Sequence, residues 1–319
     1  MSRNKYIKTV IPYSKINDIL RTQKFQNVIF HIDVQSISKG LYQKNNIFFE
    51  IDYYINNKIP ATCLIDEYKA LLNKLYKIYR QYNPFFVSFF DDGVNQQNTT
   101  ISSSYKNGRS LHSDFLQNDE TELFKKIKTN YFIELEKHFE KPHLSKVYYL
   151  KNYEADFIPH YVIMNNLFNS LNPNTLNIIL SNDKDLLQTC KFTNTIQVTN
   201  RFFASKLGKK QLGIDIYNDS TAIQYIYKNF KIGQSTAKHI PLLLALMGDK
   251  SDGIPGLKGI GAAKAIKLIQ NYNLPSSLIE LKQCTNLPTI ITDNFKLVVQ
   301  NYQLTSFEEQ LNRSKSVLD

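Results

Sequence analysis

The sequence predicts an α/β protein with a largely parallel, twisted sheet flanked by helices, followed by a helical C-terminal part. Through the first two thirds of the chain, short apolar runs alternate with segments in which apolar residues recur at helical spacing. This is the pattern of a parallel sheet that is covered on both faces. From about residue 219 onward the pattern turns helical, and a glycine-rich turn at 253–261 interrupts it.

The predicted strands are short runs of aliphatic, β-branched and aromatic residues. They span residues 27–33, 84–90, 147–150, 176–180 and 196–199. Helical periodicity predicts helices at 66–82 and 119–140, whereas the polar residues 93–108 predict a loop. Residues 1–24 carry a surplus of basic side chains and are expected to form a basic, partly helical extension.

The composition is that of a globular protein with ample core, since 42% of the 319 residues are hydrophobic and 21% are charged. Lys and Arg number 39 against 28 Asp and Glu, and the formal charge of +11 allows nucleic acid as a partner. No run approaches the ~18 apolar residues of a membrane span. Three scattered cysteines exclude a disulfide framework and suit a reducing compartment. We expect a cytoplasmic or organellar protein that is not secreted.

Acidic residues follow four of the predicted strands at the point where each strand ends. Because the carboxyl ends of parallel strands share one edge of a sheet, these side chains are expected to converge. Close carboxylates repel by roughly 3 to 5 kcal/mol per pair at an effective dielectric near 20, so the cluster requires cations or protonated acids. Oxygen ligands select hard ions such as Mg²⁺ or Mn²⁺. The acids are Asp33, Asp91, Asp92, Glu154, Asp156, Asp183 and Asp185.

Each of these acids, taken alone, is also explained as a helix cap or a turn residue, because Asp favours both. Four strand ends with the same feature favour a shared site, and Asp92 fits it least because Asp-Gly is an ordinary turn. Glu154 and Asp156 are two residues apart, and Pro159 fits only the first turn of a helix. We therefore expect Glu154 to precede the helix, where the chain is still extended.

The glycine-rich turn predicts a second kind of site. Gly259 and Gly261 precede a helix whose free amides suit a phosphate, and glycines let a nucleic-acid backbone come close. Lys264 and Lys267 lie on the outer face of that helix. The plain alternative is a helix–turn–helix corner whose glycines only cap helices.

Together these segments resemble the 5′-nuclease superfamily, which contains bacteriophage 5′→3′ exonucleases, flap endonucleases and the 5′-nuclease domain of bacterial DNA polymerase I. The string Gly248-Asp-Lys-Ser-Asp-Gly-Ile-Pro-Gly256 resembles the family's acidic turn, and residues 256–269 resemble its helix-three-turn-helix. Tyr105-Lys-Asn-Gly-Arg109 is similar to the family's Tyr-Lys-x-x-Arg. Two further matches are Tyr153-Glu-Ala-Asp156, similar to Glu-Ala-Asp-Asp, and Ser181-Asn-Asp-Lys-Asp185, similar to Asp-x-Asp.

The resemblance implies a PIN-like nuclease core at 25–215 with a helical arch at about 93–140, and a helical DNA-binding subdomain at 216–319 with its helix-three-turn-helix at about 247–270. It implies two Mg²⁺ ions, which Mn²⁺ replaces, and K⁺ at the helix-three-turn-helix. The first ion would be held by Asp33, Asp91, Glu154 and Asp156. The second would be held by Asp183, Asp185 and Asp252, with Asp249 behind.

The implied activity is that of a 5′→3′ exonuclease or flap endonuclease, acting on DNA with a 5′ flap, nick or free 5′ end and on RNA primers. Lys106 and Arg109 would act on the scissile phosphate, or form a solvated helix start, and Tyr105 would stack on a terminal base or pack in the core. The residues expected at the duplex are Gly256, Lys258, Gly259, Gly261, Lys264 and Lys267. We expect a monomer without membrane contact that works beside a separate polymerase.

The chain departs from the family pattern at three places. Phe157 replaces the second Asp of Glu-Ala-Asp-Asp, Gly253 stands where many members have Asn, and the family's upstream Arg has no counterpart within 93–104. These departures favour one alternative, a catalytically weak scaffold that binds branched DNA. A ribonuclease of the related compact acid-cluster fold lacks the glycine turn, and a phosphatase-like enzyme leaves the basic C-terminal part unexplained.

Overall fold

The computed structural model describes residues 12–34, 36, 62–92, 96–103, 105, 145–151, 154–204, 210–228, 230 and 235–318. The predicted helix at 119–140, Lys106 and Arg109 lie outside these residues. The predicted arch at 93–140 lies outside them apart from residues 96–103 and 105.

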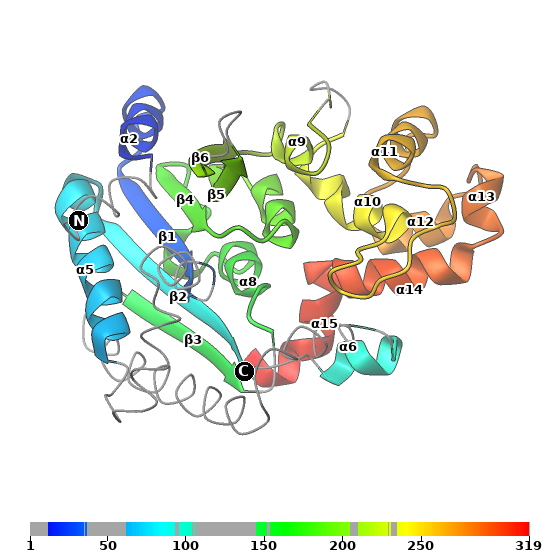
Figure 1. The fold of residues 1–319 in the computed structure, drawn as a ribbon, viewed down its shortest axis with the longest axis horizontal. Coiled ribbons are helices and arrows are strands. Elements are labelled where there is room, and N and C mark those ends of the chain that lie inside the picture. Colours follow the sequence, from blue (N-terminus) through cyan, green and yellow to red (C-terminus); the bar gives the residue numbers. More distant parts are fainter. Residues whose placement is uncertain are drawn as a thin grey trace.

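One sheet of six strands forms the core, in the order β3-β2-β1-β4-β5-β6 (Figure 1). Strands β1 to β5 run parallel, and β6 pairs antiparallel with β5. The predicted α/β class is confirmed. The strands are β1 (Asn27–Asp33), β2 (Pro84–Asp92), β3 (Ser145–Lys151), β4 (Thr175–Leu180), β5 (Thr195–Ala204) and β6 (Lys210–Tyr217).

Strand β6 was not among the predicted strands. Its sequence carries Leu212, Ile214 and Ile216 alternating with other residues, which is the period of a half-buried strand. It pairs with β5 over its full length, from Ala204↔Lys210 to Gln197↔Tyr217. The alternation was therefore the available signal for this edge strand.

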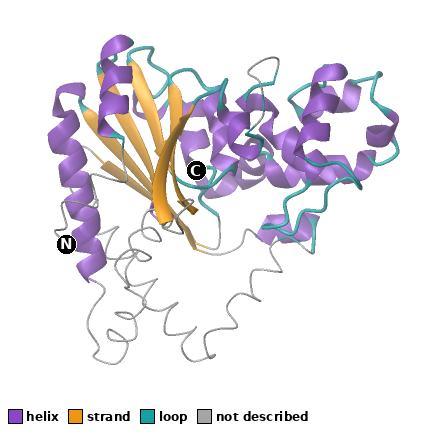
Figure 2. Ribbon diagram, turned by 45° about the horizontal axis from the view of Figure 1, so that its top comes forward, coloured by secondary structure: helices purple, strands orange, loops and turns teal. Residues whose placement is uncertain are grey.

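Successive residues of the parallel strands face opposite sides of the sheet, so both faces are apolar. Phe30 and Ile32 of β1 pack on one face beneath helices α2 (Tyr13–Thr22) and α5 (Thr62–Tyr79). Ile29 packs on the other face with α8 (Ile158–Met164) and α15 (Phe307–Leu318). Figure 2 shows helices on both sides of the sheet.

The N-terminal basic segment is more than an extension. Helix α2 within it buries Ile16 and Leu20 completely, and both side chains belong to the same core cluster as β1 and α5. The segment is helical in part, as predicted, and its helix α2 packs into the α/β core.

A short helix, α6 (Gln96–Ile101), lies in the stretch that was predicted to be a loop. Its sequence is polar and has no apolar stripe, so local periodicity could not reveal it. Contacts with the C-terminal helices hold it in place: Gln300 donates to the Ile101 carbonyl (2.6 Å) and Arg313 to Asn98 Oδ1 (2.9 Å). Tertiary contacts therefore outweigh local propensity here.

The C-terminal part is helical, as predicted, and surrounds the buried helix α10 (Ile240–Met247). Asn301 ties this part together, because its amide donates to the carbonyls of Ala245 (3.0 Å) and Pro255 (2.6 Å). No helix in the described ranges is both long and apolar enough for a membrane crossing. The other helices are α9 (Ala222–Ile226), α11 (Ala262–Asn271), α12 (Leu278–Gln283), α13 (Thr289–Thr292) and α14 (Phe295–Thr305).

Candidate functional site

The acids that follow the strands lie at the carboxyl edge of the sheet. Asp33 is the last residue of β1, and Asp91 and Asp92 are the last two of β2; the side chains of Asp91 and Asp92 are outside the described part of the structure. Asp185 begins the 3-10 helix η4 (Asp185–Lys191) that follows β4. The strand order thus brings these chain segments to one edge, as the parallel topology predicts.

Glu154 and Asp156 lie in the connection between β3 and α8, ahead of the helix. Helix α8 has Phe157 as its N-cap, and Pro159 lies within its first turn. Glu154 therefore precedes the helix, as the spacing predicts. Phe157, which replaces an acid of the family motif, is completely buried in the core cluster beneath α8 and offers no oxygen ligand.

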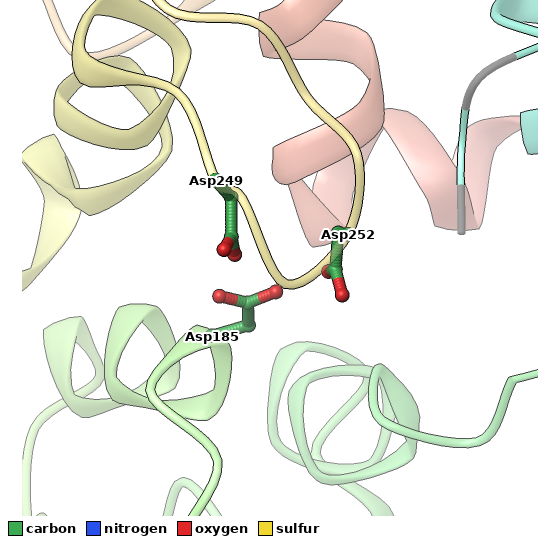
Figure 3. Close-up of side chains that lie close together, drawn as sticks. All are labelled: Asp185, Asp249 and Asp252. Carbon is green, nitrogen blue, oxygen red and sulfur yellow. The ribbon is translucent and has the colours of Figure 1, made fainter. Parts of the chain in front are cut away.

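Three carboxylates form a tight cluster at this edge: Asp185, Asp249 and Asp252 each offer an oxygen atom within 4.8 Å of the others. Figure 3 shows Asp185 pointing from η4 toward Asp249 and Asp252 on the turn between α10 and α11. Asp249 and Asp252 are only 6% and 5% exposed. Asp249, which was expected to stand behind the ion, is instead a member of the cluster.

The turn that carries Asp249 and Asp252 is closed by backbone hydrogen bonds. The amide of Asp249 donates to the Ile254 carbonyl (2.9 Å), and that of Ile254 donates to the Asp249 carbonyl (2.8 Å). Gly253 completes the turn at φ +69°, in the left-handed region that glycine and asparagine adopt most readily. Gly253 therefore suits this turn, and Asn is the other residue type that would fit it.

Two glycines beside this turn are required by the fold itself. A Cβ atom on Gly256 would lie 2.1 Å from the Met247 carbonyl oxygen, and one on Gly248 would lie 2.3 Å from the Gly256 nitrogen. Backbone therefore packs directly against backbone between the end of α10 and the turn. Gly256, which was predicted to contact DNA, has a structural reason to be glycine.

Within the described part of the chain, Lys184 brings an ammonium to this cluster. Its Nζ atom lies 2.5 Å from Asp249 Oδ2, 3.7 Å from Asp185 Oδ1 and 3.3 Å from Ser251 Oγ. The prediction from the sequence omitted Lys184. Its place between the two acids of Asp183-Lys-Asp185 was the only local signal.

The pKa values of Asp185 and Asp249 shift in opposite directions in this cluster. Burial and the charge of Asp183 raise the pKa of Asp185 well above its usual value, despite the opposite effect of Lys184. Burial would also raise the pKa of Asp249, but the Lys184 ammonium and the Ser251 hydroxyl and amide hold it below its usual value. Burial lowers the pKa of Lys184, but the charges of Asp185 and Asp249 raise it by more, so the pKa lies above its usual value.

Among the described residues, the cluster thus gathers three carboxylates around the Lys184 ammonium. Its donors are all carboxylate oxygens, the ligand type that divalent hard cations prefer. The residues therefore fit a divalent metal ion held by Asp185, Asp249 and Asp252.

Asp33 and Asp183 are held by hydroxyl and amide donors. Ser181 Oγ donates to Asp33 Oδ2 (2.5 Å), and the Ser36 amide donates to Asp33 Oδ1 (2.8 Å). Asp183 Oδ1 accepts from the Asp185 amide (2.9 Å). Asp183 therefore fixes the backbone that carries Asp185, and it is not one of the three clustered acids.

Tyr105 lies inside the protein. Its hydroxyl donates to Glu154 Oε2 (2.9 Å), and its ring, 3% exposed, packs with Ile254 and Leu304. Burial raises the pKa of Tyr105, and the charges of Glu154, Asp252 and Asp185 raise it further, so its hydroxyl stays protonated near these acids. In this structure the ring is not accessible to a base, which corrects the stacking role and leaves the packing role.

The other residues predicted at the duplex are exposed. Lys258, Gly259 and Gly261 are exposed, as are Lys264 and Lys267 of α11. A Cβ atom on Gly259 or Gly261 would meet nothing within 4 Å, and Gly261 has an ordinary φ of −99°. The fold itself therefore does not require glycine at position 261.

A cleft of about 250 Å³ adjoins the carboxylates. It is lined by Asp183 and Lys184 from one segment and by Ser251 and Asp252 from the other, with Tyr225 at its side. Tyr225 Oη donates to the Asn182 carbonyl (2.8 Å), which fixes the wall of the cleft. Of the three clustered acids, Asp252 lines this cleft, so a ligand in the cleft can reach the cluster through Asp252.

Comparisons with known proteins agree with these features. The family model described as "5'-3' exonuclease, C-terminal SAM fold" matches residues 235–318. The 5'-3' exonuclease of Buchnera aphidicola subsp. Schizaphis graminum is 25% identical over 272 residues, which cover 85% of this chain and 82% of that protein. DNA polymerase I of Borreliella burgdorferi is 31% identical over 146 residues, which cover 43% of this chain and 14% of the polymerase.

A solved structure of bacteriophage T5 5'-exonuclease with divalent metal ions (zinc) bound has the same fold. Its TM-score is 0.57 at 16% sequence identity, with 89% of this chain and 91% of that chain covered. The match spans only a part of the polymerase relatives. It covers 14% of DNA polymerase I of Borreliella burgdorferi and 23% of DNA polymerase I of Caldicellulosiruptor bescii.

Proposed function

We propose that this chain, which is similar to 5'-3' exonucleases, is a metal-dependent 5′-nuclease. In this proposal it hydrolyses phosphodiester bonds of DNA near 5′ ends or single-strand/double-strand junctions. The observation that carries the proposal is the cluster of Asp185, Asp249 and Asp252 beside an exposed, basic glycine turn. Such a pairing supports a metal centre close to a surface that suits a nucleic-acid backbone.

The proposed cofactor is a pair of Mg²⁺ ions, which Mn²⁺ can replace. When bound, such ions activate the attacking water and offset the charge that develops on the leaving 3′ oxygen. Asp185, Asp249 and Asp252 hold one ion, with Asp183 orienting Asp185. Asp33, Asp91, Glu154 and Asp156 serve the other, supported by their position at the same sheet edge.

Basic residues bind the phosphates in this proposal. Lys106 and Arg109 act on the scissile phosphate and offset its charge. The turn at 256–261 and helix α11 hold the duplex, with Lys258, Lys264 and Lys267 exposed there, and K⁺ is the ion proposed for that turn. Gly261 supports the proposal of this surface. The fold has room for a side chain at this position, and a glycine there lets another molecule approach the backbone closely.

A cleavage assay on the natural chain tests the function. We expect 5′-labelled flap, nicked and RNA-primed duplexes to be cut in Mg²⁺ or Mn²⁺, to leave 5′-phosphate products, and to remain intact in EDTA. The alternative is a catalytically weak scaffold, which Phe157 favours because it removes an acid of the family motif. Binding of flap DNA in EDTA without cleavage in either metal would support the scaffold.

Replacing Gly261 by Ala is expected to weaken duplex binding about tenfold and to change the free energy of unfolding by less than about 1 kcal/mol. The added methyl group meets no protein atom within 4 Å, so its effect falls on the phosphate backbone that approaches the turn. Gel shifts in EDTA measure the first quantity and denaturant unfolding the second. Unchanged DNA affinity in a stably folded variant would show that the duplex binds elsewhere.

A further inference from the structure

Lys184 contacts carboxylate oxygen atoms of the same acids that would hold a metal ion in the cluster. Its Nζ atom is 2.5 Å from Asp249 Oδ2 and 3.7 Å from Asp185 Oδ1, and both acids belong to the cluster described above. Ser251 Oγ accepts a hydrogen bond from the same ammonium (3.3 Å) and donates one to Asp249 Oδ1 (2.6 Å). The ammonium thus joins the segment after β4 to the turn after α10.

The Lys184 ammonium and a divalent cation in the cluster would compete for the carboxylate of Asp249. A Mg²⁺ ion approaches its oxygen ligands to about 2.1 Å, and two cations that share one carboxylate oxygen repel strongly. Lys184 has a route out of the cluster, since its side chain is 27% exposed and lines the adjoining cleft.

We propose that Lys184 is a built-in counter-cation, which neutralises Asp249 and Asp185 while no divalent ion is bound and releases Asp249 when an ion occupies the cluster. The inference rests on the metal dependence of the proposed function. It makes Lys184 a residue that sets the concentration of metal ion at which the site fills.

Two effects of opposite sign follow from this exchange. Without the ammonium, the carboxylates repel one another in the metal-free protein, and the link between the two segments is lost. The metal-free fold is then less stable. Binding of the ion no longer requires an ion pair to break, so the same substitution tightens metal binding, and the ion stabilises the variant more than it stabilises the natural chain.

The substitution Lys184→Met tests the proposal, because it keeps most of the length of the side chain and removes its charge. Mn²⁺ is titrated into the metal-free protein at fixed pH and ionic strength, and free Mn²⁺ is followed by electron paramagnetic resonance. We expect the Kd for Mn²⁺ at this site to fall about tenfold or more. The melting temperature of the metal-free variant should be lower than that of the natural chain, and its rise on addition of Mn²⁺ should be larger.

Lys250→Met is the matched control. Lys250 adjoins Asp249 in the sequence but is exposed, so its removal changes the local charge by the same amount without opening an ion pair in the cluster. We expect its Kd for Mn²⁺ to change by about twofold or less, because solvent screens an exposed charge. Lys184→Gln, which is also neutral, replaces Lys184→Met if the Met variant does not fold.

The outcomes separate this inference from the proposed function. Equal Mn²⁺ affinity in the Lys184 and Lys250 variants, or weaker affinity after Lys184→Met, would overturn the counter-cation role while the natural chain still binds metal and cuts DNA. If the natural chain neither binds Mn²⁺ nor cuts any substrate, the proposed function itself fails.

Discussion

Replacing Asp185 by Asn is expected to lower the rate of DNA cleavage in Mg²⁺ by about a thousandfold or more. Asp185 is the clustered acid that reaches from the sheet edge to Asp249 and Asp252. Asparagine keeps the size of the side chain but removes its charge, so the cation loses a ligand in a site that otherwise stays in place. Single-turnover cleavage of a labelled flap duplex measures the change.

The same variant should leave other properties intact. Because Asp185 is repelled by the neighbouring carboxylates, its neutral replacement is expected to fold at least as stably as the natural chain without metal. Affinity for flap DNA in EDTA should be unchanged or higher, since one negative charge near the phosphates is gone. Asp293→Asn, at an exposed acid after α13, is the matched control and should cut at the natural rate.

Asp183→Asn provides a sharper comparison within the site. The carboxylate of Asp183 accepts from the amide of Asp185, and the side-chain oxygen of Asn can accept the same hydrogen bond. If Asp183 acts mainly by orienting Asp185, its Asn variant should lose about tenfold in rate, far less than Asp185→Asn. Equal losses in both variants would make Asp183 a ligand in its own right.

The sequence alone could place these acids at one edge of the sheet, because this placement depends on topology rather than on side-chain detail. Parallel strands all end at one edge, so acids at or soon after these ends, such as Asp33 and Asp185, belong to the same edge of the sheet. Pro159 likewise fixes the start of α8 from local chemistry alone, because it lacks an amide hydrogen. These constraints are visible in a single sequence.

The contacts that sequence reasoning missed join segments that are distant in the chain. Lys184 meets Asp249 across 65 positions, and Tyr105 meets Glu154 across 49. Nothing in the residues next to Tyr105 distinguishes a buried aromatic ring from one that stacks on a base. Helix α6 was missed for a related reason, since contacts from Gln300 and Arg313 hold a polar segment that has no apolar stripe.

Replacing Gly256 by Ala is expected to lower the free energy of unfolding by about 3 kcal/mol. The new Cβ would lie 2.1 Å from the Met247 oxygen and 2.7 Å from the Gly248 nitrogen. Both are backbone atoms, so relief requires the end of α10 to move away from the turn. Denaturant unfolding of the metal-free protein measures the loss.

Gly261→Ala is the control that separates this effect from the general cost of adding a methyl group, because position 261 is open. The Gly256 substitution should also weaken Mn²⁺ binding, since the displaced turn carries Asp249 and Asp252. If Gly256→Ala unfolds like Gly261→Ala and binds Mn²⁺ normally, the backbone contact between α10 and the turn does not position these acids. The two glycines would then share a single role at the duplex, which is the role that the sequence alone predicts for both.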